Sequence, residues 1–181
     1  MLVNPWTFLN SKSVHILDVI KNEDVVITDV ASSTIIDVIA VANSSGSISF
    51  FNSTGKTNRC LDTITQCDEL KYCYTRVAWS PKNRLLVGGR EDGQLSCWSL
   101  ENDNNLIVST ASFSDKLTHQ GKIILLEWDK SSSPRMASCD DKGCCCLWKE
   151  DEEFVLLPLA KFNKESPIRS VNFLLEKCAV S

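Results

Sequence analysis

The chain has 181 residues, of which 43% are hydrophobic and 23% charged, with a formal net charge of −4. This is the balance of an ordinary globular protein, and its apolar runs are too short to span a bilayer, so we expect no direct membrane insertion. Lysine and arginine are scattered singly, without the basic stripe that binds phosphate backbones, so nucleic acid is not an expected partner.

The first residues lack the basic region and apolar core of a secretory signal. We therefore expect a cytoplasmic chain whose nine cysteines are reduced thiols.

Short runs of β-branched and aromatic residues, separated by polar turns, predict strands along the chain. In order, the expected strands are 14–17, 25–28, 35–42, 47–52, 55–61, 76–80, 85–89, 94–100, 105–109, 122–129, 135–139, 144–149 and 155–162. No interdomain linker is visible, so we expect one repetitive domain over residues 1–181.

The strands recur with a period set by three turn glycines. Gly46, Gly93 and Gly143 lie 47 and 50 residues apart, close to the roughly 40–50 residues of a propeller blade. Each should occupy the tight turn between the second and third strands of a blade, where glycine supplies the positive φ. The blades are expected over residues 25–65, 74–112, 119–163 and, incomplete, 167–181.

This count predicts an all-β fold consisting of an incomplete β-propeller, because closed rings need roughly four to eight blades. The chain supplies about three to four. We therefore expect it to be an N-terminal fragment or a truncated gene product.

The sequence contains no recognised catalytic motif. The two histidines, His15 and His119, have no serine or aspartate partner at a recognised spacing, and the sequence shows no nucleophile elbow, phosphate-binding loop or paired carboxylates. We expect no enzyme activity, no small-molecule substrate and no cofactor.

The spacing of the cysteines does not match a zinc site. Cys144, Cys145 and Cys146 fall in one predicted strand, where alternate side chains face opposite ways, so three thiolates cannot converge on one ion. No Cys-x-x-Cys pair exists. Core packing is the expected role, a metal site the minor alternative, and we expect no bound metal.

Four tryptophans stand at equivalent places in two units, where a large side chain fills the space between blades: Trp79, Trp98, Trp128 and Trp148.

With these units defined, residues 25–181 resemble WD40 repeats. In such blades a histidine pairs with an aspartate in the turn before the tryptophan strand, and serine and tryptophan complete the network. His119, Ser138 and Trp148 fit that pattern. Lys142 holds the expected aspartate position, with Asp141 one residue early, so we expect an incomplete network.

More narrowly, the chain resembles the N-terminal part of the intraflagellar transport protein 140 family, a subunit of ciliary transport complex A. The segments that carry this resemblance are 39–48, 76–81, 117–128, 147–148 and 169–173. Ser99 and Lys149 depart from the repeat, because each replaces the aspartate that normally follows the tryptophan.

The resemblance implies a non-catalytic protein-binding scaffold in retrograde transport, cilium assembly and ciliary cargo entry. Its partners would be the other complex A subunits, and its location the cytoplasm, the axoneme and the ciliary basal body. The alternative is another WD40 adaptor, such as a ubiquitin-ligase substrate receptor or a vesicle-coat subunit.

Propeller partners usually dock on loops at one face. The turns joining second and third strands are therefore candidate protein-binding loops, with plain solvent exposure as the alternative. Their residues are Asn43, Ser44, Ser45, Arg90, Glu91, Asp140, Asp141 and Lys142.

Overall fold

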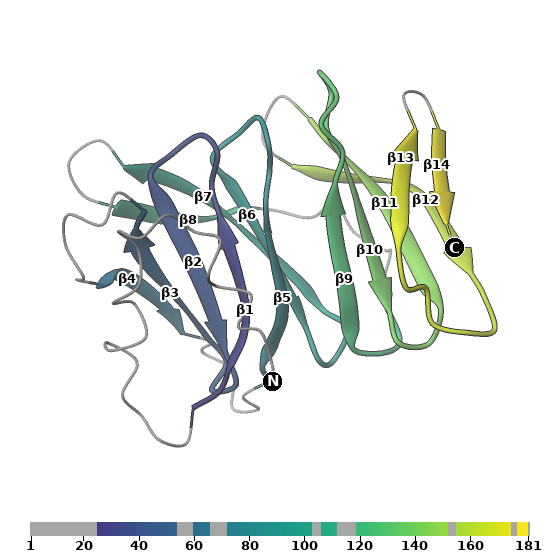
Figure 1. Ribbon diagram of the computed structural model, residues 1–181, viewed down its shortest axis with the longest axis horizontal. Coiled ribbons are helices and arrows are strands. Elements are labelled where there is room, and N and C mark those ends of the chain that lie inside the picture. The colour runs from purple at the N-terminus through teal and green to yellow at the C-terminus, as the bar shows by residue number, and fades with distance from the viewer. Residues whose placement is uncertain are drawn as a thin grey trace, which may run out of the picture.

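The computed structural model describes residues 25–53, 60–65, 72–102, 106–111, 119–151, 155–174 and 177–180. Within these residues every regular element is a strand (Figure 1). The first antiparallel sheet has the order β1-β2-β3-β4, with β1 at Ile27–Ser32, β2 at Val38–Asn43, β3 at Ser47–Asn52 and β4 at Cys60–Thr65. The described part of the chain contains no helix with the length and apolarity needed to cross a membrane.

Two more four-stranded sheets and a hairpin follow. The second sheet comprises β5 (Tyr74–Trp79), β6 (Leu85–Arg90), β7 (Leu95–Asn102) and β8 (Leu106–Ala111). The third comprises β9 (Ile123–Trp128), β10 (Arg135–Asp140), β11 (Cys144–Glu150) and β12 (Leu156–Asn163). The hairpin pairs β13 (Val171–Leu174) with β14 (Lys177–Val180).

Strand boundaries in the first sheet differ from those expected. Residues 35–37 belong to a predicted strand but form a turn, because the Ser33 hydroxyl accepts hydrogen bonds from the backbone N–H groups of Ile35 and Ile36. The strand expected at 25–28 runs instead over Ile27–Ser32, and β4 continues to Thr65. The strand expected at 14–17 lies outside the described residues.

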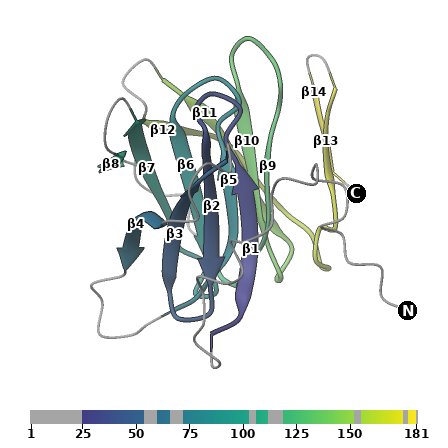
Figure 2. The ribbon, with the colours of Figure 1, turned by 60° about the vertical axis from the view of Figure 1, so that its left-hand side comes forward.

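The sheets pack face to face in chain order, as the two views show (Figures 1 and 2). Between the first and second sheets, Phe50 meets Trp79 edge to face at 6.5 Å between ring centroids. Tyr74 packs in the same manner against Trp98, at 5.6 Å. A second apolar cluster, which includes Val87, Ile123 and Trp148, fills the space between the second and third sheets.

Hydrogen bonds between the first strands of successive sheets repeat with the same period. The Thr28 hydroxyl donates to the carbonyl of Tyr74, and the Thr75 hydroxyl donates to the carbonyl of Ile123. The Asp29 carboxylate also accepts from the backbone N–H of Val77 at 2.9 Å. Because these contacts recur from sheet to sheet, neighbouring sheets are held in similar relative positions.

The three turn glycines have φ values of +79° at Gly46, +86° at Gly93 and +88° at Gly143. Two of the turns press against the segment that leads to the next sheet. A Cβ at Gly143 would lie 2.2 Å from the carbonyl oxygen of Lys164, and one at Gly93 would lie 2.7 Å from that of Gly121. Glycine is therefore required both for conformation and for space.

Candidate functional site

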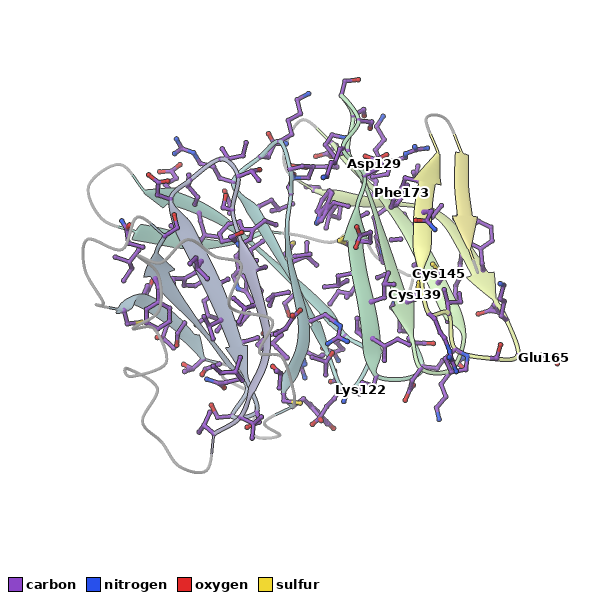
Figure 3. The ribbon with its side chains drawn as sticks, in the orientation of Figure 1. Lys122, Asp129, Cys139, Cys145, Glu165 and Phe173 are labelled. Carbon is purple, nitrogen blue, oxygen red and sulfur yellow. The ribbon has the colours of Figure 1, made fainter. Side chains whose placement is uncertain are left out.

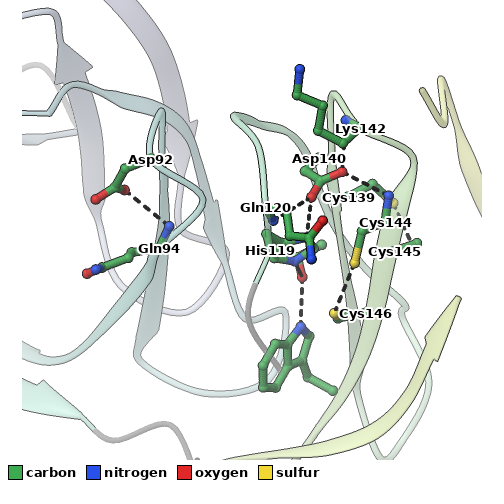
Figure 4. A network of polar contacts seen from close by, with 12 residues as sticks. Asp92, Gln94, His119, Gln120, Cys139, Asp140, Lys142, Cys144, Cys145 and Cys146 are labelled. Atoms are coloured by element: carbon green, nitrogen blue, oxygen red, sulfur yellow. Dashed lines mark hydrogen bonds and ion pairs between the residues drawn. The ribbon is translucent and has the colours of Figure 1, made fainter. Parts of the chain in front are cut away.

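A buried polar network lies where the third sheet meets the second (Figure 4). His119 precedes β9, Ser138 and Asp140 lie on β10, and Trp148 lies on β11. The Ser138 hydroxyl is 2.7 Å from His119 Nε2 and accepts a hydrogen bond from Trp148 Nε1 at 2.8 Å. His119 Nδ1 lies 3.4 Å from Asp140 Oδ2, and both side chains are fully buried.

The donors and acceptors assign the protons of this network. Nδ1 of His119 faces the Asp140 carboxylate at 3.4 Å, a mainly electrostatic contact, so the proton of the neutral imidazole is assigned to Nδ1. Nε2 then accepts from the Ser138 hydroxyl, whose oxygen in turn accepts from Trp148 Nε1.

Asp140 also closes the turn between β10 and β11. Its carboxylate accepts hydrogen bonds from three backbone N–H groups: Lys142 at 3.0 Å, Cys144 at 2.8 Å and Gln120 at 3.0 Å. Burial alone would raise the pKa of Asp140, but these hydrogen bonds and the nearby His119 hold it below its ordinary value of 3.8. The carboxylate is therefore charged at neutral pH.

The position expected for this aspartate was wrong. The sequence pattern pointed to Lys142, or to Asp141 one residue early, and predicted an incomplete network. The structure assigns the role to Asp140, which lies two residues after Ser138 on β10 and so shares its face of the strand, while Asp141 stays partly exposed in the turn.

A signal for Asp140 was present in the turn spacing. In the first sheet, Asn43 lies three residues before Gly46, as Asp140 lies three before Gly143. Asn43 Oδ1 accepts from the backbone N–H groups of Ser45 and Ser47, the same two relative positions. Aligning the repeats on their glycines would have identified Asp140.

The second sheet has a different arrangement at this position. Arg90 is buried, forms an ion pair with Asp92 at 2.7 Å and lies over the ring of Tyr72. Of the turn residues expected to bind partners, Arg90, Asn43 and Asp140 are thus engaged inside their own sheets. Glu91 and Lys142 are exposed.

The four tryptophans are buried between sheets, each less than a tenth exposed. Trp79 Nε1 donates to the carbonyl of Ala31 in the first sheet at 3.1 Å. Trp128 occupies the corresponding place in the third sheet, and its Nε1 has no hydrogen-bond partner among the described residues. His15 lies outside the described residues.

Burial of the His119 ring leads to a testable pH dependence of folding stability. Loss of hydration lowers the pKa of the ring below 6.5, although the Asp140 carboxylate opposes this shift. An unfolded chain binds the proton near pH 6.5, whereas the folded chain binds it only at lower pH. Folding stability should therefore fall as pH drops below 6.5, by up to about 1.4 kcal/mol per pH unit from this group.

NMR titration of the His119 ring is the measurement. We expect its resonances to remain those of the neutral Nδ1–H tautomer through pH 6.5, while the same histidine in urea titrates near that value. Titration of folded His119 at or above 6.5 would contradict the assigned network.

The cysteines of β10 and β11 divide between two faces of the third sheet. Cys139 and Cys145 point toward the β13–β14 hairpin side (Figure 3), and Cys139 Sγ donates to Cys145 Sγ at 2.8 Å. Cys144 and Cys146 point toward the second sheet, with 3.9 Å between their sulfur atoms. This confirms that three consecutive thiolates do not converge.

The cysteines facing the second sheet have a third neighbour that sequence spacing did not reveal. A ring nitrogen of His119 and the sulfur atoms of Cys144 and Cys146 all lie within 4.8 Å of one another. All three residues are buried. Histidine and cysteine are the usual ligands of zinc, so this group could hold a metal ion.

Neither the protein-family models nor the sequences of curated proteins give a match to this chain. Solved structures do match. A chain in the structure titled "Crystal Structure of Mitotic Checkpoint Complex" aligns with a TM-score of 0.65 and 15% identity, covering 88% of this chain and 45% of that one. Sqt1 of Saccharomyces cerevisiae aligns with a TM-score of 0.68 and 10% identity, covering 81% and 38%.

U3-55K is similar at a TM-score of 0.64 and 14% identity, covering 88% of this chain and 46% of that one. The chain therefore spans less than half the length of each matched chain. All three are WD40 β-propeller proteins. Together with the repeated antiparallel sheets, this confirms the expected all-β fold, an incomplete WD40-type propeller.

Proposed function

We propose that the chain acts as a non-catalytic protein-interaction scaffold and that it is a subunit of intraflagellar transport complex A. The burial of the Ser138–His119–Asp140 network is the observation that supports a non-catalytic role. Ser138, His119 and Asp140 are the residue types of a hydrolytic triad, and they stand in the corresponding order of contacts. Their burial argues against that role.

Ser138 is completely buried, and its oxygen already accepts the indole N–H of Trp148. A nucleophile has to reach a substrate carbonyl, and no substrate can approach an oxygen enclosed between two sheets. The network instead joins the β10–β11 turn to the segment before β9, through the hydrogen bond from Gln120 to Asp140. The turns of the blades expose residues such as Glu91 and Lys142, which a partner protein could contact.

The choice of complex A rests on the sequence resemblance in segments 39–48, 76–81, 117–128, 147–148 and 169–173. On this proposal the chain contributes to retrograde transport and ciliary cargo entry, and it is found in the cytoplasm, along the axoneme and at the basal body. Its partners are other complex A subunits.

Affinity purification of the tagged chain from ciliated cells tests this proposal. We expect co-purification of complex A subunits and a tag signal at the basal body and axoneme. Reversing the exposed charges in two neighbouring turns, Glu91→Lys with Lys142→Glu, should reduce recovery about tenfold, equivalent to roughly 1.4 kcal/mol of binding free energy.

The control is Lys130→Glu, in the exposed turn between β9 and β10 at the other end of the third sheet. It should leave recovery unchanged. Recovery of ubiquitin-ligase or vesicle-coat subunits in place of complex A would support the alternative WD40 adaptor. A tag signal confined to sites away from the cilium would end the ciliary proposal.

A further inference from the structure

Two cysteines of β11 and one histidine of a different segment form a compact donor group. Because side chains alternate along a strand, Cys144 and Cys146 share the face toward the second sheet while Cys145 faces away (Figure 4). His119, which lies just before β9, brings a ring nitrogen to the same place. The donors are thus nitrogen, sulfur and sulfur, all within 4.8 Å of one another.

We propose that His119, Cys144 and Cys146 bind one zinc ion. The spacing of the sulfur atoms agrees with this ion. Two thiolates at the usual zinc–sulfur distance of about 2.3 Å in a tetrahedral arrangement lie about 3.8 Å apart. The observed separation is 3.9 Å, so the strand presents both sulfur atoms at the required distance without a change of backbone.

The surroundings of His119 supply the outer shell that such a site uses. A histidine that ligates zinc through one nitrogen normally donates the proton of its other nitrogen to a carboxylate or carbonyl, which fixes the ring orientation. Here Nδ1 faces Asp140 Oδ2 at 3.4 Å, and three backbone N–H groups hold that carboxylate in place. Nε2 is then the nitrogen available to the ion, in exchange for its contact with the Ser138 hydroxyl.

Binding changes protonation in a defined way. Burial raises the pKa of both Cys144 and Cys146, so without an ion both are neutral thiols. A zinc ion entering the group displaces two thiol protons to solvent and leaves His119 neutral. Within the described residues the donor group has three members, and water completes the tetrahedron.

Zinc would join the lead-in segment of the third sheet to the strand that carries Trp148. His119 precedes β9, while both cysteines lie on β11, which is separated from β9 by β10 in the sheet. An ion bound to all three cross-links these parts, and any ligand that binds only the folded state raises its stability. Thermal stability should therefore rise with added zinc.

Cobalt(II) titration of the purified, reduced chain is the first test. We expect one equivalent to bind with the intense visible d–d bands of a tetrahedral site and a thiolate-to-cobalt charge-transfer band, both removed when zinc is added. Cys144→Ala and Cys146→Ala should each weaken zinc binding more than about 100-fold, since losing even an outer-shell partner commonly costs 10- to 100-fold.

The matched control is Cys145→Ala, a buried cysteine of the same strand whose sulfur lies on the opposite face. It should bind cobalt and zinc as the unmodified chain does. Equal affinity of the Cys144, Cys145 and Cys146 variants, or binding without charge-transfer bands, would overturn the proposal.

A second measurement needs no variant. Zinc should slow alkylation of Cys144 and Cys146 by iodoacetamide in mild urea, read by peptide mass spectrometry, more than it slows alkylation of Cys145 and Cys97, which gain only from the general stabilisation of the fold. Protection that is uniform across all four cysteines, or absent from all, would also overturn the site.

Discussion

Replacing Trp148 with alanine should lower the free energy of unfolding by about 3–5 kcal/mol, the range for emptying a large aromatic site in a packed core. The indole is 2% exposed and fills the space between the second and third sheets. Its Nε1 also donates to the Ser138 hydroxyl at 2.8 Å, so the substitution leaves a buried oxygen with one partner fewer. Urea denaturation followed by far-ultraviolet circular dichroism measures the loss.

The neighbouring exposed residue supplies the control. Lys149→Ala, on the same strand, should change the unfolding free energy by less than about 0.5 kcal/mol. Trp98→Ala should behave like Trp148→Ala, because Trp98 holds the equivalent place between the first and second sheets. A loss below about 1 kcal/mol for either tryptophan would mean that these rings do not support the packing between sheets.

The repeat allowed the fold to be predicted from the sequence. Gly46, Gly93 and Gly143 mark one turn per unit, and a positive φ in a tight turn is a local requirement that leaves a direct trace in the sequence. The alternation of apolar residues then places strands around each glycine. Errors arose where a side chain overrode that alternation, as at Ser33, whose hydroxyl binds the next backbone N–H groups and delays β2 until Val38.

The site was harder to predict than the fold. The prediction overlooked that Asp140 lies two residues after Ser138, on the same face of the strand, and three residues before Gly143, as Asn43 lies three before Gly46. The meeting of His119 with Cys144 and Cys146 is invisible to spacing rules, since it joins a segment before β9 to β11 across the sheet. Metal motifs read from sequence depend on ligands close together in the chain.

Asp140→Ala should cost about 3–5 kcal/mol of unfolding free energy, comparable to the loss of Trp148. Three backbone N–H groups, those of Gln120, Lys142 and Cys144, lose a charged acceptor, and each unsatisfied buried donor costs about 1–3 kcal/mol. Part of that penalty is recovered because Gln120 and Lys142 lie at the surface, where water can replace the carboxylate. Lys142→Ala, in the same turn, should change the stability by less than about 0.5 kcal/mol.

Asp140→Asn separates the charge from the hydrogen bonds. Asn43 already performs the turn role in the first sheet, so an amide oxygen at position 140 can still accept from Lys142 and Cys144. The loss in unfolding free energy should therefore be smaller, about 1–2 kcal/mol, because only the acceptor for Gln120 and the charge facing His119 are lost.

Because the pKa of Asp140 is depressed in the folded state, its extra stabilisation is present above pH 3.8 and is lost as pH falls through the folded pKa. The stability difference between the unmodified chain and Asp140→Asn should accordingly shrink as the pH is lowered from 7 to below 3.8. A difference that stayed constant over this range would show that hydrogen bonding alone, and not the carboxylate charge, holds the turn.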